Sequence, residues 1–427
     1  MKCPNFTPGN YVSARARRAF FLGLHNAVAL GLLGACCLAP PAAFAQYAPY
    51  APPIDTGTDT PLKNLTVLVG GSVTHDSNLF RSPGLTGIGP QSDTISTAYV
   101  GLRLDQPYGL QRFTLDLTQS YNRYDRFSYL DYEPLTYGGA WLWQLGTRLS
   151  GRLGVTRSET QSFENQLSPL RNVRINQTEA FDLDAWMLDG WHLLLGVGQS
   201  DQKSERNLLN REPDFSSTFA SVGVKYVTGA GNDITLRRQR SDGEYINRPV
   251  GSIDNGYTET FTELGVVWRP SGSSTLNARL GWLNRSQNDI TLRDFSGPSS
   301  SLSYNWAPAG NLSLNISAAR RTSPLQSVTA TYLQSDTLDV QPIWRIGQKI
   351  SAYLRLSYQR ASDEDVLVAL PTGPRVDTTN SATLGLSWLA MRRLSLNASL
   401  LHTQRTSTVI LSEYDATVAR IDASLAF

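Results

Sequence analysis

The chain has 427 residues, of which 41% are hydrophobic and 17% charged, and its 38 basic and 36 acidic residues give a formal net charge of +2. This balance gives no electrostatic reason to expect a nucleic-acid partner. The length would suit two or three globular domains, but no apolar run of about 18 residues follows the first forty-five residues, which excludes a transmembrane helix there. An exported soluble protein and a β-barrel remain as the two candidate classes.

Residues 1–45 have the layout of an export signal. Lys2 and three arginines, Arg15, Arg17 and Arg18, precede the uncharged, mostly apolar stretch from Ala19 to Leu38. Ala43-Phe44-Ala45 places small residues at the two positions that a signal peptidase reads, so we expect a cleaved signal peptide and a mature start at Gln46. An alternative is that Leu33-Gly34-Ala35-Cys36 acts as a lipobox, with Cys36 lipidated as the mature N-terminus.

All three cysteines, Cys3, Cys36 and Cys37, precede Gln46, so the mature chain carries no thiol for a disulfide, a metal site or a nucleophile. The leader also holds four of the basic residues and none of the acidic ones. The mature chain therefore keeps 34 basic and 36 acidic residues, a net charge of −2.

Residues 46–63 contain four prolines, Pro49, Pro52, Pro53 and Pro61, and predict a short periplasmic lead-in that cannot form a strand ladder. From residue 64 to 427 apolar residues recur at every second position in stretches of about ten residues. In residues 275–284, for example, Leu276, Ala278, Leu280 and Trp282 alternate with polar residues or glycine. This pattern predicts an all-β fold, a transmembrane antiparallel up-and-down β-barrel over residues 64–427.

About eighteen strands are predicted, an even number, with starts near Leu65, Ser92, Arg112, Leu135, Arg148, Thr178, His192, Ser216, Asp233, Tyr257, Thr275, Ser299, Leu312, Ser335, Ile350, Thr378, Leu394 and Ala416. The weakest are Asp233–Arg240, interrupted by three arginines, and Ser335–Trp344, which contains Pro342. Because a soluble sandwich also alternates, the connections are needed to separate the two folds.

The connections alternate in length. Short turns at 228–232, 270–273 and 307–311 alternate with longer polar loops at 244–256 and 361–377, as at the periplasmic and extracellular rims of an outer-membrane barrel. Tryptophans close four strands just before short turns, and we interpret them as an aromatic girdle at the inner (periplasmic) membrane–water interface of the outer membrane: Trp268, Trp306, Trp344 and Trp388. The alternative is that they are buried core tryptophans.

The last strand ends on Phe427, with Leu425 and Ala423 at the alternate positions before it. This pattern resembles the C-terminal signal that the outer-membrane barrel assembly machinery recognises. The expected partners are therefore the outer-membrane lipid bilayer and that machinery.

If the apolar set faces lipid, the opposite set faces a hydrated lumen, where ionised groups are less costly. The predicted lumen-lining residues are Arg103, Asp116, Arg152, Asp182, Asp184, Lys225, Glu263, Arg279 and Arg355. Barrels of this size leave an aqueous channel unless something fills it, which predicts a path for a polar solute. The alternative is a wall of paired charges that stabilises a plugged barrel.

The segment Tyr121–Tyr132 combines aromatic, amide and carboxylate side chains, a composition that suits sugar binding but also an outer aromatic girdle running into a loop. No enzyme motif is present. The mature histidines, His75, His192 and His402, lie on three separate predicted strands without metal-ligand spacing, so we expect no catalytic residue, no metal and no cofactor. A hydrolase site using His75 or His402 with a serine on the barrel wall is a third possibility.

The chain also resembles EpsL, an outer-membrane protein of exosortase (PEP-CTERM)-associated exopolysaccharide operons, within the wider class of β-barrel porins. The resemblance rests most specifically on Gly71–Arg81, and further on residues 101–108, 111–113, 124–130, 140–143, 190–193, 287–297 and 414–416. It implies a component of exopolysaccharide biosynthesis or export in the outer membrane of a Gram-negative bacterium, with exopolysaccharide and periplasmic export proteins as further partners. The expected function is a porin-like lumen for polysaccharide or another polar solute; the alternatives are a plugged barrel for adhesion or anchoring, and a general diffusion porin.

Overall fold

The computed structural model describes residues 64–84, 89–161, 170–205, 214–246, 256–325, 330–366, 373–409 and 411–427. The predicted signal peptide, the three cysteines and the lead-in at 46–63 lie outside these residues. No helix in the described part of the chain is long and apolar enough to cross a membrane.

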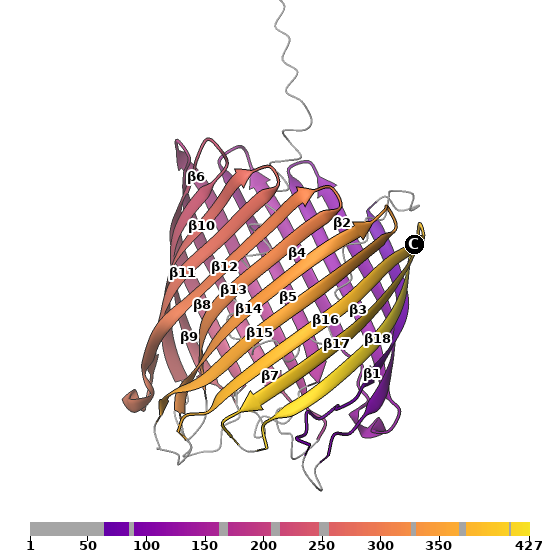
Figure 1. Cartoon of the computed structure of the whole chain (residues 1–427). Coiled ribbons are helices and arrows are strands. Elements are labelled where there is room, and N and C mark those ends of the chain that lie inside the picture. Colours follow the sequence, from indigo (N-terminus) through magenta and orange to yellow (C-terminus); the bar gives the residue numbers. More distant parts are fainter. Residues whose placement is uncertain are drawn as a thin grey trace, which may run out of the picture. The chain divides into compact units, whose positions relative to one another are not determined.

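A single sheet of eighteen antiparallel strands forms the fold (Figure 1). The strands are β1 (Leu65–Asp76), β2 (Asp93–Tyr108), β3 (Gln111–Tyr124), β4 (Leu135–Leu145), β5 (Leu149–Gln161), β6 (Val173–Leu188), β7 (Trp191–Ser204), β8 (Phe215–Val227), β9 (Asp233–Tyr245), β10 (Gly256–Ser271), β11 (Ser274–Gln287), β12 (Phe295–Ala309), β13 (Leu312–Pro324), β14 (Ala330–Ile346), β15 (Ile350–Val366), β16 (Val376–Met391), β17 (Leu394–Ser407) and β18 (Tyr414–Ala426).

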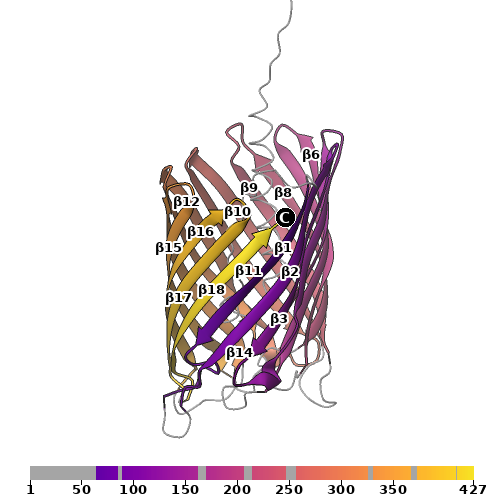
Figure 2. The same ribbon diagram turned by 90° about the vertical axis from the view of Figure 1, so that its right-hand side faces the viewer.

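The sheet closes because β1 pairs with both β2 and β18 (Figure 2). Every strand therefore has two neighbours, and no edge is left with unpaired backbone groups. The prediction of an up-and-down antiparallel barrel of eighteen strands is confirmed.

Connection lengths alternate around the barrel. Eight turns of two to five residues lie at the end where β18 terminates, and connections of five to sixteen residues lie at the opposite end. Several short turns use glycine in the left-handed region, as at Gly109 (φ +60°) and Gly190 (φ +87°), where other residues would be strained. We refer to these as the short-turn end and the long-loop end.

Some strands are longer than the sequence predicted. β6 begins at Val173 instead of Thr178, β12 at Phe295 instead of Ser299, and β14 at Ala330 instead of Ser335. The added residues lie near the long-loop end, where the outer face becomes polar and the apolar alternation fades. For the same reason β9 continues to Tyr245, and the loops predicted at 244–256 and 361–377 are shorter than expected.

Apolar side chains such as Val73, Leu280 and Leu384 are more than half exposed on the outer face of the isolated barrel. In water this surface would be unfavourable, whereas a bilayer covers it. The outward apolar band therefore identifies the sheet as a membrane-spanning wall.

Candidate functional site

The inner face of the barrel carries the polar half of each alternating strand. All nine residues predicted to line the lumen lie at positions that alternate with exposed apolar residues, and the register joins several of them across strands. Arg103 Nε lies 2.6 Å from Asp116 Oδ1, and Arg279 Nη1 lies 3.7 Å from Glu263 Oε1. Arg355 Nη2 lies 2.8 Å from Asp339 Oδ1, a partner that the sequence analysis did not select.

Strands β6 to β9 bring a larger charged group together. Asp184 contacts His192 Nδ1 at 2.6 Å and also forms an ion pair with Lys225. Nearby, Arg237 Nη2 lies 3.1 Å from Asp182 Oδ1 and 2.7 Å from Ser221 Oγ. Carboxylates and basic side chains therefore lie next to each other on this part of the inner wall.

Arg152 belongs to the same region, because it lies opposite Asp182 in the β5–β6 register. His192 and Arg237 were not selected from the sequence as lumen residues. His192 lies between the outward apolar residues Trp191 and Leu193, and Arg237 follows the outward Leu236. The alternation alone could therefore have identified both.

These inner-wall pairs are partly solvent-exposed, which separates them from buried ion pairs. The side chains of Arg103 and Asp116 are 46% and 61% exposed. Exposed pairs of this kind contribute little to stability, about 0–1 kcal/mol each, because water screens them. Their effect falls instead on the electrostatic potential that a solute in the lumen would meet.

Near the long-loop end the inner face is packed. The Arg285 side chain is 1% exposed and lies 3.3 Å from the Tyr257 ring centroid, with Nη1 3.0 Å from Glu259 Oε2 and Nη2 2.8 Å from Tyr245 Oη. Such a buried, hydrogen-bonded cation is held in place by its partners. Solvent therefore has little access to the inner face at this cluster.

A second packed cluster lies on the β1–β4 side of the same end. Leu79, Phe80, Ile95, Tyr124 and Leu130 form a buried apolar group, although Ile95 and Tyr124 are at inner-face positions. The connections after β1 and β3 therefore pack against the inner wall. They narrow the long-loop end of the lumen on this side.

The segment Tyr121–Tyr132, whose composition suits an outer loop, is divided between the end of a strand and the connection that follows it. Its first four residues belong to β3, Ser128–Leu130 form a 3₁₀ turn, and Asn122 pairs with Tyr132. Tyr121 and Tyr129 remain exposed, whereas Tyr124 and Leu130 belong to the buried apolar group. Tyr124 and Leu130 are therefore taken up by packing, and Phe127 and Tyr132 pack partly against the same buried group.

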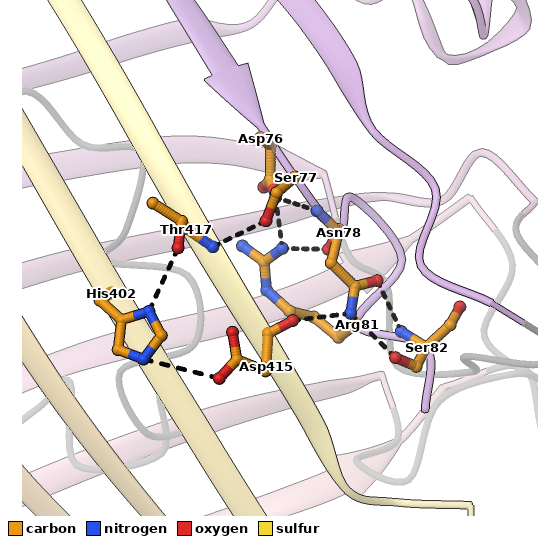
Figure 3. Close-up of polar contacts among 8 residues, drawn as sticks. All are labelled: Asp76, Ser77, Asn78, Arg81, Ser82, His402, Asp415 and Thr417. Carbon is orange, nitrogen blue, oxygen red and sulfur yellow. Dashed lines mark hydrogen bonds and ion pairs between the residues drawn. The ribbon is translucent and has the colours of Figure 1, made fainter. Parts of the chain in front are cut away.

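The Gly71–Arg81 segment closes the seam between the first and last strands (Figure 3). Asp76 Oδ1 accepts hydrogen bonds from the Asn78 backbone N–H at 2.9 Å and from Arg81 Nη1 at 2.8 Å. Asn78 Nδ2 donates to the backbone carbonyls of Ser82 at 2.8 Å and Asp415 at 2.9 Å. The segment that carries the family resemblance is therefore a structural clasp between β1 and β18.

His75 and His402 lie on the outer face, not in the lumen. Their Nδ1 atoms are 3.1 Å from the hydroxyl oxygens of Thr94 and Thr417, and His402 Nε2 is 3.5 Å from Asp415 Oδ2. The hydroxyl that each histidine contacts is therefore a threonine's. Within the described ranges, no group of His, Cys, Asp and Glu side chains could hold a metal ion.

The four girdle tryptophans are exposed at outward positions near the short-turn end, together with Phe427, which is 44% exposed. Buried core tryptophans are thereby excluded. Backbone hydrogen bonds of 2.9 and 3.0 Å join Phe427 to Val67 and complete the barrel at its seam.

The chain is similar to known β-barrel porins in part of its sequence and in its fold. Residues 265–427 match the family model described as "Putative beta-barrel porin 2". Among solved structures, OccK2 (OpdF) of Pseudomonas aeruginosa is similar with a TM-score of 0.50 and 14% identity, covering 85% of this chain and 98% of that one. The outer membrane protein OpdK of Pseudomonas aeruginosa gives a TM-score of 0.49 and 12% identity, covering 86% and 100%.

A BenF-like porin from Pseudomonas fluorescens Pf-5 also gives a TM-score of 0.49 and 12% identity, covering 85% and 98%. No curated protein sequence matches the chain. At this level of identity the likeness concerns the fold. The chain is a porin-like β-barrel of the outer-membrane type.

Proposed function

We propose that this barrel is a passage across the outer membrane for a polar solute, and that its cargo is an exopolysaccharide during biosynthesis or export. The observation that carries the proposal is the inner wall, where partly exposed ion pairs such as Arg103–Asp116 and Arg355–Asp339 line a closed barrel of eighteen strands. A wall of this kind favours hydrated polar solutes over apolar ones.

The link to exopolysaccharide rests on the resemblance to EpsL, carried by Gly71–Arg81 and the further segments named above. A sugar polymer is rich in hydroxyls and well hydrated, so it suits a lumen that alternates charges of both signs with serine, threonine and glutamine side chains. A general diffusion porin is the less specific form of the same proposal.

We further propose that the chain reaches the outer membrane by cleavage of residues 1–45 and insertion by the barrel assembly machinery, and that it works with periplasmic export proteins. We infer that it is not an enzyme and needs no cofactor. The contacts of His75 and His402 support this inference, because in the described part of the chain each Nδ1 atom lies against a threonine hydroxyl and not against the serine expected of a hydrolase site.

The proposal is tested by reconstituting the purified barrel in planar lipid bilayers and recording current. We expect stable single-channel conductance that falls when a soluble polysaccharide from the producing strain is added to one side. A barrel that inserts, shown by heat-modifiable migration, but never conducts would overturn the passage.

A plugged barrel that acts in surface adhesion or anchoring is the second candidate. The packed group around Phe80 and Leu130 favours it, because this group narrows the lumen at the long-loop end. Phe80→Ser with Leu130→Ser should loosen that packing. If only this variant conducts and wild type does not, the plugged barrel is the better description.

A further inference from the structure

Two phenylalanine rings of the inner wall lie directly over glycines of neighbouring strands. A Cβ atom at Gly198 would lie 2.4 Å from Phe219 Cζ, and a Cβ atom at Gly281 would lie 2.3 Å from Phe261 Cζ. Nonbonded carbons approach to about 3.5 Å at best, so only glycine allows each ring to lie against the backbone. Both rings stay partly exposed.

Strand β9 lies between the two rings. In the register, Ser241 is opposite Phe219 and Gln239 is opposite Phe261. Phe219 leans toward β7 and Phe261 toward β11, so both rings lean away from β9. We call the set of Phe219, Phe261, Gln239 and Ser241 the phenylalanine frame.

The polar part of the frame is an amide next to a hydroxyl. Gln239 Nε2 lies 3.3 Å from Ser241 Oγ, a long hydrogen bond that leaves the amide oxygen available as an acceptor. Because adjacent strands are about 4.8 Å apart, Gly198 on β7 and Gly281 on β11 are separated by roughly 19 Å along the wall. That span accommodates several linked sugar rings.

The charges that border the frame cancel. Arg237 pairs with Asp182 at 3.1 Å, and Arg279 pairs with Glu263 at 3.7 Å. Glu259, which is opposite Ser241, pairs with Arg285 at 3.0 Å. These three ion pairs contain three cations and three anions, and they leave no excess charge to attract an anionic polymer. A neutral ligand therefore fits this part of the wall better than a uronate.

We propose that the phenylalanine frame is a binding subsite for a neutral oligosaccharide, a deepening that rests on the proposed role of the lumen. The C–H faces of pyranose rings stack on Phe219 and Phe261, while sugar hydroxyls exchange hydrogen bonds with the Gln239 amide and Ser241 hydroxyl. The glycine seats hold each ring against the wall, which keeps the path beside it open.

The same ring-on-glycine contact also stabilises sheets, so the experiment needs a control of that kind. Tyr353 supplies it, since a Cβ atom at Gly385 would lie 2.2 Å from Tyr353 Cζ on the β15–β16 wall, away from the frame. The variants are Phe219→Leu, Phe261→Leu and Gln239→Ala, with Tyr353→Leu as the matched control.

Binding of maltohexaose is measured by calorimetry on the detergent-solubilised full barrel, with tri- to hexagalacturonate as the anionic probe. We expect wild type to bind maltohexaose more tightly than the uronate, and each frame variant to bind it about fivefold more weakly. Tyr353→Leu should bind like wild type. Gln239→Ala leaves the ring packing intact, so it reports on sugar contacts even if a phenylalanine variant fails to fold.

Equal weakening by Tyr353→Leu, or unchanged binding by all three frame variants, would overturn the subsite and leave the rings a structural role. Tighter binding of the uronate would overturn the choice of a neutral ligand. Because calorimetry needs no conduction, binding at the frame without bilayer current would reject the passage while keeping the subsite. Current without frame-dependent binding would reject the subsite and keep the passage.

Discussion

Asn78 donates its side-chain amide to the backbone carbonyl of Asp415, which lies 337 positions later in the chain, at 2.9 Å. The oxygen of this side-chain amide accepts a hydrogen bond from the Ser82 backbone N–H at 2.9 Å, and Asn78 is completely buried. One side chain thus joins the first connection of the barrel to its last strand. The seam between β1 and β18 is the one pairing that depends on both ends of the chain.

Asn78→Ala should destabilise the barrel, because it leaves buried backbone groups of Ser82 and Asp415 without partners. A buried unpaired group costs about 1–3 kcal/mol, so the urea midpoint of unfolding in detergent should fall. Asn277→Ala is the control, since Asn277 makes only a 3.4 Å contact with Ser303 on the hydrated inner wall. Equal midpoints for the two variants would show that the clasp adds nothing to closure.

Phe427→Ala should impair insertion more than it affects the finished barrel. The backbone hydrogen bonds between Phe427 and Val67 do not need the phenyl ring, which is exposed on the outer face. We expect mature, cleaved protein to accumulate in the periplasm, while barrels that do insert melt close to the wild-type temperature. Fractionation and heat-modifiable migration measure the two quantities.

Deletion of Phe427 serves as the comparison, because it also removes both backbone hydrogen bonds at the seam. It should lower the melting temperature as well as the yield. If Phe427→Ala reaches the outer membrane at wild-type levels, the terminal residue does not act as the assembly signal.

Arg279→Ser and Arg355→Ser should shift ion selectivity toward cations. Each change removes a lumen cation and leaves a carboxylate, Glu263 or Asp339, with less compensation. The reversal potential in a salt gradient measures the shift. Arg320→Ser is the matched control, since the Arg320–Asp336 pair lies on the outer face and should not affect the conducted ions. An identical shift for Arg320→Ser would contradict the assignment of the lumen wall.

Alternation predicted the barrel and both faces well because its period is a local property. Leu276, Leu280 and Arg279 are assigned to their faces by sequence position alone. Pro342 does not interrupt β14, although proline has no N–H to donate to a ladder. The β14–β15 pairing skips from Val340 to Ile343, so no ladder hydrogen bond from residue 342 is required there. Only the register of the neighbouring strand reveals this.

The cross-strand contacts could not be predicted, because they depend on register and on connections. Phe219 lies over Gly198 only because β7 and β8 pair in one particular register, and a shift of one residue would move the ring to the other face. Arg285 occupies an inner-face position like the lumen charges, yet Tyr245 and Tyr257 bury it. Burial at the long-loop end comes from residues far apart in the sequence.

Leu280→Arg and Leu354→Arg test which face meets lipid. Both leucines are exposed on the outer face in mid-strand, and an arginine at the bilayer midplane costs about 2–4 kcal/mol. Folding yield into lipid vesicles should fall for both. Leu401→Arg is the matched control, because Leu401 alternates with the exposed Leu400 and lies on the inner face, where water can solvate the guanidinium. Normal folding of the Leu280 and Leu354 variants together with failure of Leu401→Arg would reverse the two faces, and the proposals for the lumen would fail with them.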